Sequence, residues 1–309
     1  MTTRRNFLKN TTMLAAGLGV SPLLSSSPLR SYQKEEVING KVRIAVIGVG
    51  MGCRDLQGAL TDNPWVHCVG MCDVNKVRLE EQLARFKKDF PEQTVSIKAY
   101  TDFREVLANK EIDGVIIATP DHWHPYIFAE ALKAGKAIYV EKPVGNSISE
   151  CNAMMDFQKK YKGVVTTGLW QTSQRYFRAA NEILKSGVLG DVYKVQLWLC
   201  QSTNPRPSVE DSEAPSTLDY DMWLGPAPER PFNNSRFRGW RGFWDHGGGQ
   251  QTDWGVHWID SAFDGLKALG LCDREYPDAV FSIAYKDPAS FNETPSCQTS
   301  IFQYKNFHI

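Results

Sequence analysis

The stretch that decides the fold is VRIAVIGVGMGC, residues 42–53. Its first half, Val42–Ile47, is mostly apolar and β-branched, which is typical of a buried strand. The strand pattern ends at Gly48, and further glycines follow at Gly50 and Gly52 before a helical pattern begins. Glycine permits a tight turn and lets backbone N–H groups at a helix start approach phosphates closely. The stretch therefore predicts a strand–turn–helix unit that holds the pyrophosphate of a dinucleotide.

An acidic residue after the second predicted strand supports this interpretation. The run Val66–Met71 reads as that strand, and Asp73 follows it, roughly 25 residues after Gly48 and near the spacing expected for a ribose-binding acid. A carboxylate at this place accepts hydrogen bonds from ribose hydroxyls and repels a 2′-phosphate. The sequence therefore predicts NAD as the cofactor, and the nearby cations Lys76 and Arg78 leave NADP possible.

The glycine turn departs from the usual pattern at one position. Cys53 stands where a third glycine or alanine is usual, and cysteine is small enough for a helix to pack on a strand there. The alternative is an ordinary glycine turn in an α/β domain that binds no ligand. The expected pyrophosphate contacts are Gly48, Gly50, Met51 and Gly52.

Short apolar runs alternate with helical stretches between residues 40 and 168, which predicts a doubly wound parallel sheet, that is, a Rossmann domain. The expected strands are 42–47, 66–71, 114–118, 137–140 and 163–167, and the expected helices include 74–86, 124–134 and 147–161.

The pattern changes after residue 169. A helix is expected at 173–185, and the alternating run 192–202 predicts antiparallel sheet. A Pro-rich stretch, 204–231, follows. Residues 169–309 are therefore expected to form an α+β domain with a mostly antiparallel sheet. Because residues 307–309 read as part of a strand, we expect this domain to be incomplete at its C-terminus.

The first 39 residues are expected to be an export signal and linker. Arg4 and Arg5 precede Phe7, and a short, weakly apolar run from Met13 to Leu24 follows. This order resembles a twin-arginine signal, which directs folded proteins to the periplasm, often with their cofactor bound. A loose N-terminus with an accidental Arg pair is the alternative.

Composition excludes several classes of function. Lys plus Arg and Asp plus Glu both number 35, and no basic stripe supports nucleic-acid binding. No stretch approaches the ~18 apolar residues of a membrane span. The seven cysteines show no metal-ligand spacing, so no metal is expected. Cys68 and Cys72 lie about 13 Å apart along one predicted strand and cannot form a disulfide.

Three later motifs carry a family resemblance. TPDHWH at 119–124, EKP at 141–143, and GGG at 247–249 followed by DWGVHWID at 253–260 resemble the Gfo/Idh/MocA dehydrogenases. The resemblance implies sugar or polyol substrates, and oligomers formed through the sheet of the second domain. It also implies a nicotinamide-side set made of Thr119, Pro120, His124, Glu141 and Lys142.

The resemblance gives catalytic roles to Lys142, Asp253 and His257. On a helix, Asp253 and His257 are four residues apart and project from one face. Histidine suits a base that removes a hydroxyl proton at neutral pH, and a lysine cation would orient the hydroxyl and stabilise developing negative charge. The alternatives are a core histidine between Trp254 and Trp258 and a surface lysine. One of His122 and His124 is expected to be structural.

Arg175, Trp240 and Arg241, together with Asp253, are candidate substrate contacts, since tryptophan faces stack on sugar rings. The equal alternative is that the tryptophans pack the sheet or a subunit interface.

Three functions stay open on the sequence alone. The first is an NAD-dependent oxidoreductase that acts on a secondary hydroxyl of a sugar, glycoside or cyclic polyol. The second is a redox-neutral glycosidase that uses NAD and a transient keto-sugar; the EKP and Asp-x-x-x-His elements together argue against it. The third is a non-catalytic dinucleotide-binding protein, which the presence of Lys142, Asp253 and His257 disfavours.

Overall fold

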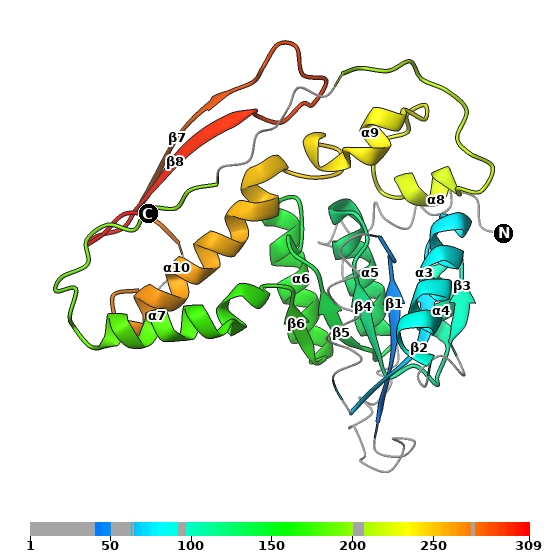
Figure 1. The fold of residues 1–309 in the computed structure, drawn as a ribbon, viewed down its shortest axis with the longest axis horizontal. Helices are drawn as coiled ribbons and strands as arrows, with labels where there is room; N and C mark the ends of the chain where they lie inside the picture. The colour runs from blue at the N-terminus through cyan, green and yellow to red at the C-terminus, as the bar shows by residue number, and fades with distance from the viewer. Residues whose placement is uncertain (1–40, 51–62, 64, 92–96, 200–206, 273–275) are drawn as a thin grey trace, which may run out of the picture. The chain divides into compact units, whose positions relative to one another are not determined.

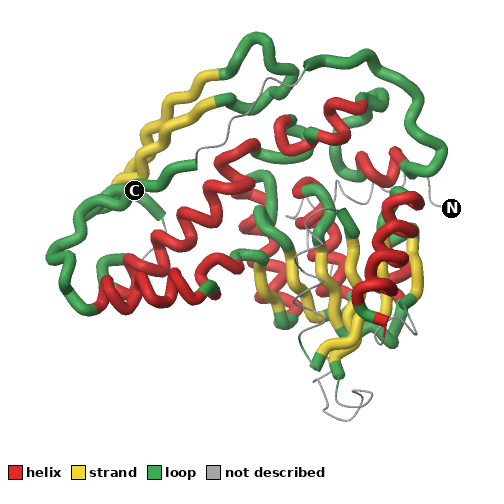
Figure 2. The backbone as a smooth tube through the Cα atoms, in the orientation of Figure 1, coloured by secondary structure: helices red, strands yellow, loops and turns green. Residues whose placement is uncertain are grey.

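The computed structural model describes residues 41–50, 63, 65–91, 97–199, 207–272 and 276–309. The predicted export signal, Met51, Gly52, Cys53 and the helix expected after the glycine turn lie outside the described residues. The chain groups into two compact units, Met1–Thr166 with Glu213–Phe232, and Thr167–Ser212 with Asn233–Ile309. Figure 1 colours them by chain order and Figure 2 by secondary structure.

A six-stranded parallel sheet forms the centre of the first unit. The strand order is β3-β2-β1-β4-β5-β6, which is the order of a doubly wound dinucleotide-binding sheet. The predicted Rossmann sheet is therefore confirmed. The strands are β1 (Val42–Ile47), β2 (Val66–Cys72), β3 (Lys98–Tyr100), β4 (Gly114–Ile117), β5 (Ala137–Val140) and β6 (Val165–Thr167).

Helices cover both faces of this sheet (Figure 2). One apolar cluster joins α3 to the strands, with Leu79 and Phe86 buried against Val46 and Met71. A second, separate cluster joins the other face to the remaining helices. Burial on both faces explains why these strands read as nearly continuous apolar runs. The helices are α3 (Lys76–Asp89), α4 (Phe103–Ala108), α5 (His124–Lys133) and α6 (Ile148–Tyr161).

Local sequence sets where the helices begin. The Ser147 side chain accepts the N–H of Glu150, and the Glu150 carboxylate accepts the N–H of Ser147, so α6 starts with a capping box. Asn75 caps α3 in the same way by accepting from the N–H of Arg78.

The sheet has a switch point at β1, because β2 and β4 lie on either side of it. The chain after β1 and the chain after β4 therefore leave in different directions at the carboxyl edge, where open α/β sheets bind ligands. Gly48, Asp73, Thr119 and Glu141 all follow the ends of strands at this edge.

The described part of the second unit includes two packed helices and a two-stranded sheet. Helix α7 (Arg175–Lys185) packs on α10 (Val256–Ala268), and the Asn181 amide donates to the Asp264 carboxylate at 2.5 Å. Strands β7 (Ala279–Tyr285) and β8 (Cys297–Gln303) pair antiparallel, which confirms an antiparallel sheet in this part of the chain. Residues of α10 and of the chain after β8 share a small apolar core.

The expected strand at 192–202 is wrong in its described part, residues 192–199. Only Lys194 forms an isolated bridge, with His308, and the backbone bonds there are Val195 N–H to His308 and His308 N–H to Tyr193. Residues 307–309 likewise contain one bridging residue and no strand. An alternating pattern forms a strand only where a neighbouring strand can hydrogen-bond to it over several residues, and here only one residue is paired.

The segment Glu213–Phe232 groups with the dinucleotide domain although it comes from the second half of the chain. The expected domain boundary near residue 168 stays a prediction. The sequence did not indicate that a later segment of the chain would pack with the first unit.

Candidate functional site

The glycine turn approaches the end of β4 so closely that no side chain fits at Gly48. A Cβ there would lie 2.6 Å from backbone atoms of Ala118 and Thr119, and Gly48 has a φ of +88°. The Gly48 N–H donates to the Cys72 carbonyl at 2.8 Å. Positive φ and close backbone contact both require glycine. The first glycine of the motif is therefore fixed by geometry.

Asp73 holds this turn against the end of β2. Its carboxylate accepts the N–H of Val49 at 3.0 Å and the N–H of Asn75 at 2.8 Å, and it is 7% exposed. Burial raises the pKa of Asp73, and the Asn75 N–H, the charge of Arg78 and the Val49 N–H oppose this. Asp73 therefore organises the backbone of the glycine turn, and its carboxylate is of the kind that could accept hydrogen bonds from a ribose.

Two further observations fit a dinucleotide at this edge. The Thr119 hydroxyl oxygen is buried and has no hydrogen-bond partner among the described residues. A guanidinium nitrogen of Arg78 lies 3.9 Å from where a Cβ of Gly50 would be, so positive charge borders the turn. An unsatisfied buried hydroxyl needs an explanation, and a phosphate or ribose oxygen supplies one. The residues at this edge of the sheet therefore fit a bound dinucleotide.

His124 joins two of the loops that the sequence singled out. Its ring is 1% exposed, with Nδ1 2.8 Å from the Pro143 carbonyl oxygen and Nε2 2.9 Å from the Thr119 carbonyl oxygen. Both nitrogens are thus engaged by backbone. His124 ties the Thr119 loop to the loop after β5, and its expected direct contact with the cofactor stays a prediction.

The loop after β5 is held by its own acid. The Lys142 N–H donates to the Glu141 carboxylate at 3.1 Å, and the Tyr139 hydroxyl donates to it at 3.4 Å. Burial and the Glu141 charge raise the pKa of Tyr139, so that hydroxyl stays a donor. The Lys142–Pro143 peptide is cis. Glu141 therefore shapes the loop, and Lys142 is half-buried at the carboxyl edge.

In the second unit, Asp253 and His257 lie on consecutive turns and are both buried. Residues Gln251–Gly255 form a π-helical turn that leads into α10, where the sequence predicted α-helix throughout. Single π turns occur often at functional sites.

Asp253 is paired with Arg241. The Arg241 Nε lies 3.0 Å from Asp253 Oδ1, and the Arg241 guanidinium stacks 4.2 Å from the centre of the Trp240 ring. The His257 ring contacts Trp170 edge-on at 5.7 Å. The structure therefore brings four predicted residues of this unit together: Trp240, Arg241, Asp253 and His257.

The glycine run before these residues is a packing requirement. Gly249 has a φ of +73°, and a Cβ on it would lie 2.8 Å from the Thr294 side chain. A Cβ on Gly247 would lie 3.0 Å from the Arg241 backbone. The run therefore lets Arg241 and the helix start approach each other.

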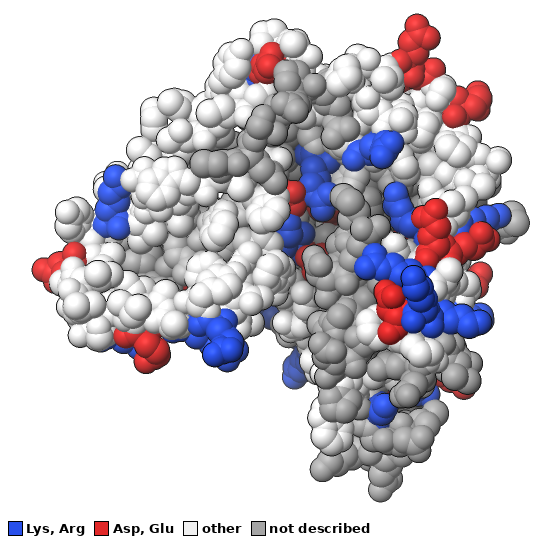
Figure 3. Space-filling model, in the orientation of Figure 1, with Lys and Arg blue, Asp and Glu red and all other residues white. Residues whose placement is uncertain are grey.

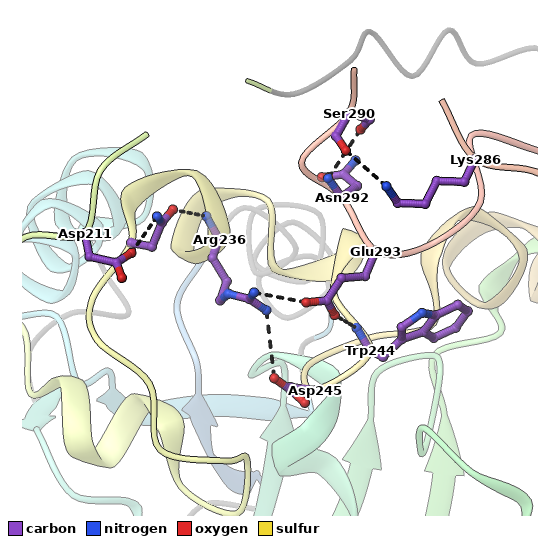
Figure 4. A network of polar contacts seen from close by, with 9 residues as sticks. Asp211, Arg236, Trp244, Asp245, Lys286, Ser290, Asn292 and Glu293 are labelled. Carbon is purple, nitrogen blue, oxygen red and sulfur yellow. Dashed lines mark hydrogen bonds and ion pairs between the residues drawn. The ribbon is translucent and has the colours of Figure 1, made fainter. Parts of the chain in front are cut away.

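A buried arginine that the sequence did not indicate supports this region (Figure 4). Arg236 pairs with Glu293 at 3.0 Å and with Asp245 at 3.8 Å, and it stacks 4.1 Å from the Phe243 ring. Glu293 also accepts the Trp244 N–H at 3.0 Å. This network fixes the chain on either side of Arg241. The sequence did not indicate it, because a single arginine in a turn-rich stretch matches no motif.

Arg175 lies apart from these contacts. It is the first residue of α7, is exposed, and has no hydrogen bond or ion pair in the part of the chain that the structure describes. Its expected role in substrate binding stays a prediction.

Other classes of site find little support in the described ranges. No group of three or more His, Cys, Asp or Glu side chains there is arranged to hold a metal. No described helix has the length and apolarity needed to cross a membrane. On the face in Figure 3, basic and acidic side chains are interspersed.

Comparison with known proteins defines the class. Residues 42–169 match the model of an oxidoreductase family's NAD-binding Rossmann fold, and residues 178–267 match that family's C-terminal α/β domain. The first match gives the chain an NAD-binding Rossmann fold of an oxidoreductase family. The two matches together cover most of the chain, which belongs to the Gfo/Idh/MocA family.

Curated proteins of two kinds are among those that match this chain. An α-N-acetylgalactosaminidase of Tannerella forsythia is 33% identical over 163 residues, which is 48% of this chain and 34% of the relative. Inositol 2-dehydrogenase of Salmonella typhimurium is 24% identical over 151 residues, or 48% of this chain and 43% of the relative. The chain thus spans less than half the length of these relatives.

Solved structures share the fold. The WlbA dehydrogenase of Bordetella pertussis, crystallised with NADH and UDP-GlcNAcA, has a TM-score of 0.62 at 17% identity, covering 87% of this chain and 70% of that one. Aldose-aldose oxidoreductase of Caulobacter crescentus has a TM-score of 0.61 at 20% identity, covering 87% and 69%.

Proposed function

We propose that this protein is an NAD-dependent oxidoreductase that acts on a secondary hydroxyl of a sugar, glycoside or cyclic polyol. The observation that carries the proposal is the buried pair of Asp253 and His257 on consecutive turns, with Arg241 bound to the aspartate. A structural histidine does not need an aspartate one turn earlier, an arginine paired with that aspartate and a glycine run that admits both.

Each residue has a defined task in this proposal. Bound NAD would supply the hydride acceptor or donor. His257 takes the hydroxyl proton, because imidazole changes charge near neutral pH. Asp253, held by Arg241, binds the substrate and orients the histidine. Lys142 belongs to the first compact unit, and its role as the cation that stabilises negative charge on the hydroxyl oxygen is the one that the resemblance implies.

The test is product analysis. The full chain is incubated with NAD and a panel of sugars, glycosides and inositols, and ketone products are detected by mass spectrometry. We expect a ketone from at least one substrate, and a loss of at least about 100-fold in its rate in His257→Ala, since general base catalysis contributes ~10²–10⁴-fold. Unchanged turnover in His257→Ala would overturn the assignment.

A redox-neutral glycosidase is the second candidate. Its support is the likeness to an α-N-acetylgalactosaminidase and to family 109 glycosyl hydrolases. In that reaction a ring hydroxyl would be oxidised to a ketone with NAD as hydride acceptor. A neighbouring proton and the aglycone would then be eliminated, water would add to the resulting enone, and the same hydride would return to the ketone. Release of an aglycone from a glycoside without net NADH formation favours this candidate, and net ketone without bond cleavage favours the first.

We further propose that the protein is exported through the twin-arginine pathway and keeps its dinucleotide bound in the periplasm. The support is the order of residues 4–27 in the sequence. Replacing Arg4 and Arg5 with lysine is expected to leave the protein in the cytoplasm, as measured by cell fractionation. Denaturing the purified exported protein should release nucleotide, and finding none would contradict retention.

We also propose a homo-oligomer formed through the sheet of the second unit. Phe281, Ile283 and Tyr285 lie on one face of β7, and Ile301 of β8 is paired with Phe281. All four side chains are exposed, so this face of the sheet is apolar. Contiguous exposed apolar surface marks an association site. Light scattering is expected to give a dimer or larger assembly that Phe281→Ser and Ile283→Ser together dissociate. A monomeric parent protein would contradict the proposal.

A further inference from the structure

The segment Glu213–Phe232 is attached to the dinucleotide domain at the residues that follow Asp73. The Lys76 N–H donates to the Thr217 carbonyl at 2.9 Å, and the Asp219 N–H donates to the Val74 carbonyl at 3.0 Å. Between them, Leu218 forms an antiparallel bridge with Asn75. Residues 217–219 therefore pair with the chain directly after Asp73, the expected ribose-binding residue.

A second attachment lies at the loop after β4. The Trp223 carbonyl oxygen is 3.0 Å from the His122 Nε2 and accepts the Trp123 indole N–H at 3.0 Å. Gly225 lies so close to the Trp123 ring that a Cβ would come within 2.1 Å of it. This loop begins at Thr119, whose buried hydroxyl has no partner among the described residues.

The segment between these attachments is packed and ordered. Helix α8 (Tyr220–Leu224) lies there, with Trp223 and Leu224 buried, and the Tyr220 ring stacks on Trp223 at 5.6 Å. The Asp219 side chain caps the helix by accepting the Met222 N–H at 3.0 Å. Such a segment is a fixed wall and needs no ordering when a ligand binds.

We propose that the 213–232 segment is part of the dinucleotide site and retains the adenosine half of the cofactor. Its attachment at the chain after Asp73 borders the expected position of the adenosine ribose, and its attachment at the loop after Thr119, which the resemblance puts on the nicotinamide side, holds the other end of the segment. This inference rests on the proposed dinucleotide-dependent function. It predicts that loosening the segment at its Asp73 end weakens binding of ADP-ribose and leaves binding of nicotinamide mononucleotide unchanged.

Asp219 allows a sharp test because its φ of −76° suits proline and Leu218 before it is in a bridge. Asp219→Pro removes the N–H bonded to Val74 and also the helix cap. Asp219→Ala removes the cap alone and is the matched control. Calorimetry on the full chain should show ADP-ribose binding about 2–10-fold weaker in Asp219→Pro than in Asp219→Ala, the loss expected for one hydrogen bond.

Hydrogen exchange on the parent protein tests the proposal even where Asp219→Pro fails to fold. ADP-ribose is expected to slow amide exchange at residues 217–219, which bond to the chain after Asp73, and nicotinamide mononucleotide is not. If ADP-ribose binds and this protection is absent, or if the two Asp219 variants bind it equally, the segment is not part of the site. If the parent protein binds neither NAD nor ADP-ribose, the proposed function itself fails.

Discussion

At the scale of single residues, Gly48 shows why the turn needs its glycine. Its φ is +88°, and a Cβ would lie 2.6 Å from the Ala118 carbonyl. Gly135 has a similar φ of +70° but nothing within 4 Å of its Cβ position. A substitution at Gly135 therefore tests backbone strain alone, and one at Gly48 tests strain together with the close contact to the chain after β4.

We expect Gly135→Ala to cost only the left-handed strain, about 1–2 kcal/mol. Gly48→Ala should cost about 3 kcal/mol or more, because backbone must also move, and it should weaken NAD binding. Urea unfolding measures the first effect and calorimetry the second. Equal losses in the two variants would show that the contact with β4 is unimportant.

At the scale of elements, an ion pair joins β1 to the start of β4. Arg43 contacts the Asp113 carboxylate through its guanidinium at 2.8 Å and its backbone N–H at 2.8 Å. Burial alone would raise the pKa of Asp113, but the hydrogen bonds and charge of Arg43 lower it overall. A carboxyl whose folded pKa is lowered stabilises the fold above its unfolded pKa.

Asp113→Asn is therefore expected to lose about 1–3 kcal/mol at pH 7. The difference from the parent should shrink as the pH falls below ~4, where the parent carboxyl also becomes protonated. Asp89→Asn, at the exposed Arg85–Asp89 pair, is the control and should change stability by less than about 1 kcal/mol. A deficit that does not depend on pH would contradict this account.

His124 couples two loops at the same scale. Because its ring nitrogens lie at the Thr119 and Pro143 carbonyls, His124→Phe removes the polar contacts of this ring with both loops. We expect a loss of about 1–3 kcal/mol in unfolding free energy and weaker NAD binding. His124→Gln keeps a donor and should recover part of both. Unchanged NAD affinity in His124→Phe would show that the two loops do not depend on this ring.

The sequence predicted elements best where local pattern and burial agree. The strand 137–140 has the observed bounds, and the helix expected at 147–161 begins after its Ser147 cap. Short elements such as α9 (Asn234–Arg238) escaped because one turn has no periodicity. The run 192–199 misled because its alternation does not reveal whether a partner strand exists.

The candidate site was predictable to the extent that its residues lie in local motifs. The glycine turn, Asp73 and the Asp253–His257 spacing can be read from the chain directly. The Arg241–Asp253 pair, the Arg236 network and the 213–232 segment depend on contacts between distant residues. No spacing rule encodes such contacts.

At the scale of the whole molecule, the two compact units should respond differently to ligand. NAD is expected to stabilise the unit that holds the glycine turn and Asp73, by about 2.7 kcal/mol at a concentration of 100 Kd. Scanning calorimetry should then show that NAD raises the unfolding temperature of the first unit more than that of the second. Equal shifts for both units, or none, would contradict the assignment of NAD to the first.

The most direct measurement of the central claim is label transfer in a single turnover. A sugar deuterated at its secondary carbons is mixed with the full chain and NAD, and the nucleotide is analysed by mass spectrometry. We predict one deuterium on the reduced nicotinamide with the parent protein and almost none with Lys142→Met or His257→Ala. A sugar that binds but never passes deuterium to NAD, or equal transfer by all three proteins, would contradict the account.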